Sequence, residues 1–268
     1  MLTRVRSALA VQLRIHHHES VDSTSERLFA ALAAGSAQHG DVHVARQQTA
    51  GRGRRGASWH SAADGGLYLS LLLLPGAPAL HPAALTMAAG IAALETAREL
   101  GIASARLKWP NDVVVDRAAG EPAKLAGVLV ETRGLDPAAP HYVVGIGLNV
   151  AQVEFPAELL AARRVTSIAL EGGNASLERA EQILLARLRR ELEREALESP
   201  ELGARFLAAA QLEDRSVSVE LGERELRGRV RALELRRGLL LEPEVTAGTH
   251  AASEWLPLEH IRQVRPSA

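Results

Sequence analysis

The sequence predicts an α+β protein in two units, a larger unit over residues 1–212 and a small β-barrel over residues 213–268. The stretch Leu67–Leu74 is almost continuously apolar, which is typical of a central buried strand. Leu177–Leu197 has the apolar period and the charged outer faces of an amphipathic helix. From Ser216 onward the pattern changes to short strands separated by turn residues, as in a small barrel.

Composition excludes several classes of protein. The chain has 268 residues, a formal net charge of −1 and 47% hydrophobic residues, which fits a globular protein with a sizeable core. It contains no cysteine, so disulfides, thiolate metal sites and cysteine nucleophiles are excluded. The near-neutral charge argues against a protein that binds nucleic acid mainly through charge. Neither a membrane span nor a signal segment is apparent, so we expect a cytoplasmic protein with no membrane association.

The first elements follow from local patterns. Ile15–Val21 is predicted as an edge strand despite its three consecutive histidines, because neighbouring side chains of a strand point to opposite faces. Ser23 and Glu26 form an S-x-x-E capping box, which predicts that a helix begins there and leaves hydroxyl groups at its N-terminus. Further strands are predicted at Asp41–Arg46, Lys124–Glu131 and Tyr142–Leu148, and further helices at Pro82–Leu100 and Glu201–Leu212.

The segment Gly51–Gly56, with the sequence GRGRRG, is the strongest candidate site. Its glycines let a ligand approach the backbone, and its arginines match carboxylate or phosphate groups. We therefore predict an anion-binding loop; the alternative is a basic turn that contacts nucleic acid. The letters also match G-x-G-x-x-G, but the residues that follow have no helical period, so a dinucleotide-binding fold is rejected.

A second candidate stretch is Lys108–Asp112, with the sequence KWPND, where Pro110 interrupts a strand. One interpretation is a tight turn in which Trp109 fills the core. The other is a binding platform, with the indole beneath a base and the Asp112 carboxylate on Mg²⁺. Both interpretations stay open at this level.

Glycines also interrupt two predicted strands. Gly127 lies within KLAGVLVE, which begins at Lys124, and Gly145 and Gly147 lie within GIGLN. A glycine inside a strand often marks the close approach of a ligand. The segment Ala151–Gly173 is irregular and is long enough to be a lid or a second ordered loop. No motif for a protein nucleophile and no P-loop are present, so any ATP site would be of another type.

The four ordered motifs GRGRRG, KWPND, KLAGVLVE and GIGLN together resemble those of biotin protein ligases. These enzymes make biotinyl-5′-AMP from biotin and ATP, and pass the biotin to a lysine of a carrier domain. The resemblance implies a central mixed β-sheet flanked by helices, of the class II synthetase-like type found in biotin and lipoate ligases. It also implies that the C-terminal barrel is SH3-like.

The resemblance implies roles for specific residues. Arg52, Arg54 and Lys124 would be catalytic, and Asp112 would bind the metal. Biotin would be bound by Ser23, Thr24, Ser25, Gln48, Gly51, Arg52, Gly53, Arg54, Lys124 and Gly127. ATP would be bound by Arg52, Arg54, Arg55, Lys108, Trp109, Asn111, Asp112 and Asn149. The family commonly has Asn where this chain has Ser25, which puts the contact of that residue in doubt.

The resemblance also implies ATP and Mg²⁺ as cofactors and biotin as a substrate. The expected partner is the biotin carboxyl carrier domain of acetyl-CoA carboxylase or a related carboxylase, and a homodimer is expected to be possible. Because few residues precede the first predicted strand, we expect the enzyme-only type without an N-terminal DNA-binding domain. The alternatives are a lipoate or octanoate ligase or transferase of the same fold, or a nucleic-acid-binding module, which the low aromatic content of 3% disfavours.

Overall fold

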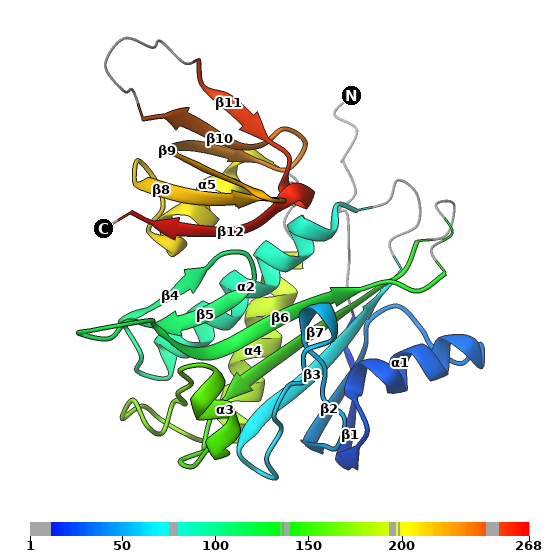
Figure 1. Cartoon of the computed structure of the whole chain (residues 1–268). Coiled ribbons are helices and arrows are strands. Elements are labelled where there is room, and N and C mark those ends of the chain that lie inside the picture. The colour runs from blue at the N-terminus through cyan, green and yellow to red at the C-terminus, as the bar shows by residue number, and fades with distance from the viewer. Residues whose placement is uncertain are drawn as a thin grey trace, which may run out of the picture.

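The computed structural model describes residues 12–74, 80–134, 136, 140–192, 197, 199–244 and 252–267. They form a seven-stranded sheet, a five-stranded sheet and the helices that cover them (Figure 1). The strands of the large sheet are β1 (Arg14–Val21), β2 (Asp41–Gln48), β3 (Gly66–Leu73), β4 (Ala105–Lys108), β5 (Asp112–Val115), β6 (Ala123–Glu131) and β7 (Tyr142–Asn149).

The large sheet has the order β1-β2-β3-β7-β6-β5-β4. Its β1 and β2 run parallel, and every later neighbouring pair is antiparallel, so the predicted mixed sheet is confirmed. All eight residues of β3 are buried, because this strand is paired on both edges and covered on both faces. The continuous apolar run of the sequence is therefore a central strand, as predicted.

Helices cover the two faces of this sheet. The helices are α1 (Thr24–Ala33), α2 (Pro82–Glu99), α3 (Ala157–Ala162), α4 (Leu177–Leu192) and α5 (Pro200–Ala210). Alternation along β3 sends Leu71 into the core shared with α2 and α4, and Leu72 into a smaller cluster with Leu28 and Phe29 of α1. The helix α1 thus packs on the face opposite to α2 and α4, and its N-terminus lies beside Gln48 at the end of β2 and Ser70 in the middle of β3.

The start of α1 is correct in the prediction, but its capping box is wrong. Ser23 is the N-cap residue and has an extended backbone, yet its side chain makes no capping hydrogen bond. Glu26 does not reach back to the cap, because its carboxylate pairs with the guanidinium groups of Arg52 and Arg133. Two cations distant in sequence therefore outcompete a local hydrogen bond.

The histidine-rich strand β1 is the edge strand of the sheet, as predicted. His16 and His18 share one face of β1 with His43 of β2. The Nε2 atom of His18 lies 3.0 Å from Nδ1 of His43, and the rings of His16 and His43 are 4.9 Å apart between centroids. Burial lowers the pKa of His43 to about 4, and the neighbouring imidazoles add to this effect.

We expect this cluster to lower the free energy of unfolding as the pH decreases. The pKa of His43 falls from 6.5 to about 4 on folding, so the unfolded chain binds more protons between these values. Its contribution is fully present above pH 6.5 and is lost as the pH falls toward 4. His43→Gln should therefore flatten the decline of the urea midpoint over this window. His17→Gln is the control, because His17 faces Glu181 on the other side of β1, and an unchanged decline in His43→Gln would refute the assignment.

The C-terminal region is a separate antiparallel sheet with the order β11-β10-β9-β8-β12. Its strands are β8 (Ser216–Leu221), β9 (Arg224–Glu234), β10 (Gly238–Pro243), β11 (Glu254–Leu256) and β12 (Ile261–Pro266), of which the sequence did not predict β11. The C-terminal β unit is confirmed, and its closure as an SH3-like barrel stays a prediction, as does the boundary between residues 212 and 213.

The two sheets share one core through α5. A Cβ atom at Gly203 of α5 would lie 1.9 Å from the carbonyl oxygen of Leu233 in β9, so only glycine allows this close contact. One turn further along α5, Phe206 packs edge-on against Trp109 with 5.8 Å between ring centroids. In the described part of the chain, no helix is long and apolar enough to cross a membrane.

Candidate active site

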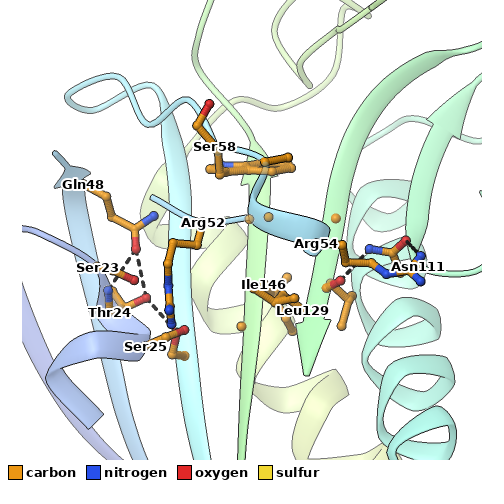
Figure 2. A pocket seen from close by; sticks show the side chains of 18 of the residues that line it. Ser23, Thr24, Ser25, Gln48, Arg52, Arg54, Ser58, Asn111, Leu129 and Ile146 are labelled. Atoms are coloured by element: carbon orange, nitrogen blue, oxygen red, sulfur yellow. Dashed lines mark hydrogen bonds between the residues drawn. The ribbon is translucent and has the colours of Figure 1, made fainter. Parts of the chain in front are cut away.

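A cavity of about 220 Å³ opens between the N-terminus of α1, the loop Gly51–Gly56 (the Gly/Arg loop), and strands β3, β6 and β7 (Figure 2). Most of the predicted site residues line it. These are Ser23, Thr24, Ser25, Gln48, Arg52, Gly53, Arg54, Arg55, Asn111, Asp112, Lys124 and Gly127. Segments distant in sequence therefore meet at one place, as the motifs predicted.

One end of the cavity is polar and uncharged. The side-chain oxygen of Gln48 accepts hydrogen bonds from the backbone N–H and the hydroxyl of Thr24, at 2.9 and 3.1 Å. The hydroxyl of Ser70 lies 2.7 Å from that of Thr24 and 3.0 Å from that of Ser25. Ser70 was not predicted as a site residue, because within the apolar run of β3 it looks like one polar position among leucines. Figure 2 shows Gln48 and the residues Ser23–Ser25 on one side of the cavity and Arg54 with Asn111 on the other.

Arg52 anchors the Gly/Arg loop to two elements of the scaffold. Its guanidinium contacts Glu26 of α1 at 2.7 Å and Glu131 of β6 at 2.8 Å. Burial raises the pKa of Glu131, although the positive charge of Arg52 opposes the shift. The charge of Arg52 is thus already balanced by two carboxylates, which fixes the loop at the α1 side of the cavity.

The rest of the loop presents cations that have no carboxylate partner among the described residues. The Nη1 group of Arg54 donates a hydrogen bond to Oδ1 of Asn111 at 3.2 Å, in a turn that the backbone closes with a 2.7 Å bond between Gly53 N–H and the Ala57 carbonyl. Burial, with the neighbouring charge of Arg55, lowers the pKa of Arg54. Arg55 has a left-handed backbone with φ of 56°. These two guanidinium groups can receive an anion.

Trp59 is a site residue that the sequence reasoning missed. Gly127 of β6 and Gly147 of β7 are paired in register, and the indole lies over both. A Cβ atom at Gly147 would be 2.4 Å from the ring, and one at Gly127 would be 3.0 Å from it. The glycines do signal a close approach, but the group that approaches is Trp59, three residues beyond the Gly/Arg loop.

Lys124 and Asp112 form an ion pair in the wall of the cavity. Their Nζ and Oδ1 atoms are 2.6 Å apart, and the ammonium lies 5.2 Å from the centroid of the Trp59 ring. Asp112 is the one acidic side chain among the described residues that line the cavity. Lys124 therefore lies where a second anion can compete with Asp112 for its charge.

Four predicted residues lie outside the lining of this cavity, and three of them line neither this cavity nor the second one described below. Lys108 binds Glu121 at 3.0 Å and faces a different hollow beside β12. Asn149 is buried and donates a hydrogen bond to the Thr166 carbonyl at 2.9 Å. Gly51, the first residue of the loop, packs against the backbone instead: a Cβ atom there would be 2.6 Å from the Trp59 carbonyl oxygen.

Trp109, the fourth such residue, lines a second cavity of about 500 Å³. Trp109 is 94% buried, as expected if its side chain fills the core, but part of the residue still lines this cavity. The second cavity adjoins the first, since Arg54, Arg55 and Asn111 line both. Its far wall comes from the C-terminal region, at Leu258–Ile261.

Comparisons with known proteins agree with this arrangement. The sequence profile of the biotin/lipoate A/B protein ligase family matches residues 18–149. The chain is 36% identical to the bifunctional ligase/repressor BirA of Salmonella typhimurium over 84% of this chain and 68% of the relative. It is also 36% identical to the biotin--[acetyl-CoA-carboxylase] ligase of Mycobacterium tuberculosis, over 74% of this chain and 71% of the relative.

The fold is also found among solved structures. The biotin protein ligase of Aquifex aeolicus in complex with biotin and ATP superposes with a TM-score of 0.72 at 28% identity. The alignment covers 94% of this chain and 99% of the other. Because profile, sequence and structure agree, this chain belongs to the biotin/lipoate A/B protein ligase family, as a biotin protein ligase.

Proposed function

We propose that this protein activates biotin with ATP to biotinyl-5′-AMP, and then transfers biotin to a lysine of a carboxyl carrier protein. The observation that carries the proposal is the division of the cavity into a neutral polar end and a strongly cationic end. The cations that line it outnumber its one described acid, Asp112. Such a cavity suits a ligand with an uncharged polar head and a carboxylate tail, placed beside a phosphate chain.

The neutral end is proposed to bind the ureido ring of biotin. That ring offers two N–H donors and one carbonyl acceptor, and the hydroxyl and amide groups of Thr24, Ser25 and Gln48 can pair with both kinds of atom. The apolar side chains of Leu69 and Ile146 then cover the rest of the molecule. In this pose the carboxylate of biotin extends toward Lys124 and the Gly/Arg loop.

The cationic end is proposed to stabilise the reaction of two anions. The biotin carboxylate attacks the α-phosphate of ATP, and pyrophosphate leaves. Arg54, Arg55 and Lys124 reduce the repulsion between the two reactants and stabilise the negative charge that develops. One such donor contributes about 3 kcal/mol in the transition state. Closure of the loop over the product would keep water from the mixed anhydride.

The second cavity is proposed to hold the nucleoside of ATP. Arg54, Arg55 and Asn111 line both cavities, which supports a position for the α-phosphate at their junction. Trp109 then contributes one wall of the nucleoside cavity. Lys108 and Asn149 line neither cavity, so we assign them no direct contact with ligand.

Mg²⁺ is proposed to accompany the phosphates, with Asp112 as its protein ligand. The residues fit this role in one respect: Mg²⁺ needs only one or two carboxylates, because phosphate oxygens and water complete its shell. Asp112 is held by Lys124 at 2.6 Å, so its second oxygen is the one available to a metal. Bound Mg²⁺ would neutralise charge on the leaving pyrophosphate.

The acceptor is proposed to be a carboxylase carrier domain, as the name of the Mycobacterium tuberculosis relative indicates. A homodimer, a cytoplasmic location and the lack of a DNA-binding domain stay predictions. Family membership leaves the nucleic-acid-binding module without support. Lipoate or octanoate remains the alternative acid on the same fold.

Pyrophosphate exchange into ATP tests this function directly. With Mg²⁺ present, we expect exchange that depends on biotin and is absent with lipoate, with octanoate or with no acid. Biotin-dependent exchange supports formation of the acyl-adenylate. Exchange with lipoate or octanoate instead would keep the chemistry and reject biotin as substrate. No exchange with any acid from folded protein would reject the adenylation reaction itself.

A further inference from the structure

The segment that follows α3 runs beside the first residue of the KLAGVLVE motif. The backbone N–H of Lys124 donates to the Arg164 carbonyl, and the N–H of Thr166 donates to the Lys124 carbonyl, both at 2.9 Å. These two bonds make a parallel bridge between Lys124 and Val165. Arg163, just before it, has an extended backbone with φ of −162° and ψ of 157°.

Strand alternation then separates the two consecutive arginines of this segment. In an extended chain, Arg163 and Val165 point to one side and Arg164 points to the other. Arg163 and Val165 both line the hollow that contains Lys124 and Trp59, and Arg163 also lines the main cavity. Arg164 turns away, and its Nη1 group donates to the Ala119 carbonyl at 3.1 Å.

The charge of Arg163 has no carboxylate partner among the described residues, in contrast to the charges of Arg52 and Lys124. Arg52 is balanced by two carboxylates, and Lys124 is balanced by Asp112. Arg163 is exposed, and its guanidinium has no hydrogen-bond or ion-pair partner within the described ranges of the chain. A free guanidinium at the wall of a cationic cavity increases the repulsion there, unless an anionic ligand joins it.

We propose that Arg163 is a phosphate-binding residue for ATP, acting from the segment after α3 on the side of the cavity occupied by Lys124 and Trp59. This inference rests on the proposed adenylation. Arg163 lines the main cavity but not the second one, where the nucleoside is proposed to lie. Its guanidinium would therefore bind oxygens of the phosphate chain rather than the base or the ribose.

The same position would give the segment of residues 151–173, which contains α3, a contact with substrate. Its backbone is fixed to β6 at Lys124, so a phosphate bound by both Lys124 and Arg163 would join the segment to the sheet. From its length alone, the sequence left open whether this segment is a lid or a second ordered loop. Arg163 gives it a specific contact with substrate.

The test compares Arg163→Gln with Arg164→Gln, since the two arginines are adjacent and only the first faces the cavity. We expect Arg163→Gln to raise the KM for ATP in biotin-dependent pyrophosphate exchange about tenfold, the size expected for one hydrogen bond to a charged group. The dissociation constant for biotin alone should not change. Arg163→Lys should recover part of the loss, and Arg164→Gln should match the wild type.

Three outcomes would overturn the inference. The first is a KM for ATP in Arg163→Gln equal to that of the wild type. The second is an equal loss in Arg164→Gln, which would mean a structural role for the pair. The third is normal exchange with a raised KM for the carrier protein only, which would place Arg163 at the carrier interface. If the wild-type protein itself shows no exchange with any acid, the proposed function has failed, and not this residue assignment alone.

Discussion

Replacing Lys124 by alanine is expected to lower the rate of biotinyl-5′-AMP formation by about a hundredfold or more, while the protein stays folded. Lys124 is the cation that lies between Asp112 and the Trp59 ring, where the biotin carboxylate and the α-phosphate are proposed to meet. Loss of one such donor removes about 3 kcal/mol of transition-state stabilisation. It also leaves the Asp112 carboxylate unbalanced and facing two anionic substrates. Single-turnover formation of the adenylate measures the effect.

The control for this prediction is Lys108→Ala. Lys108 lies in the adjoining hairpin, but Glu121 holds it outside both cavities. We expect this variant to form adenylate at close to the wild-type rate, and both variants to keep the circular dichroism of the wild type. A folded Lys124→Ala protein with an unchanged rate would contradict the role assigned to Lys124. A large loss in Lys108→Ala would instead support the contact with ATP that the sequence resemblance implied.

Gly147→Ala is expected to lower the free energy of unfolding by about 1–3 kcal/mol, the usual cost of overpacking, and to abolish measurable binding of biotin. The added Cβ atom would lie 2.4 Å from the Trp59 ring, so the indole has to move. The ring forms part of the cavity wall, and its displacement changes the shape of the biotin site. Urea denaturation and calorimetric titration with biotin measure the two effects.

A matched control and a double-mutant cycle isolate the cause. Gly145 lies two residues earlier on the same face of β7, and a Cβ atom there would meet its nearest neighbours, the Leu129 carbonyl oxygen and the Ser25 hydroxyl, at an ordinary 3.4 Å. Gly145→Ala should therefore cost less stability than Gly147→Ala. In a Trp59→Ala background, Gly147→Ala should lose most of its destabilising effect. Additive costs in the cycle would show that the glycine serves something other than the indole.

Most strands and helices of the large unit were predictable because these elements have a simple hydrophobic period. The helix α3 was not predicted, since it lies within residues 151–173, which the sequence indicated as irregular. The composition of the cavity was largely predictable too, since the glycines of GRGRRG allow close approach to the backbone and its arginines match anions. The structural role of Arg52 was not predictable, because it depends on Glu26 and Glu131.

Sequence could not reveal which buried group fills a given space. Gly127 and Gly147 indicated the close approach of another group. A glycine within a strand is needed in the same way whether that group is an indole or a ligand, so the sequence could not distinguish the two.

Long-range charge pairing accounts for the other differences. The S-x-x-E pattern is local, whereas Glu26 is bound by Arg52 and Arg133, which lie on other elements. In the same way, Glu121 in the loop after β5 removes Lys108 from the cavity that the KWPND motif approaches. Such competitions depend on the folded arrangement, so a motif predicts that a charge is near a site but not which partner it takes.

Because Gly203 contacts the carbonyl of Leu233, α5 packs closely against the small sheet as well as belonging to the larger unit. Leu202 and Phe206 of this helix belong to the same buried cluster as Val219 and Leu239 of the small sheet. A chain that ended after α5 would expose that cluster to water and remove one wall of the nucleoside cavity. The small sheet is thus coupled to the larger unit in unfolding, and substitutions in its core should weaken nucleotide affinity without touching any ligand.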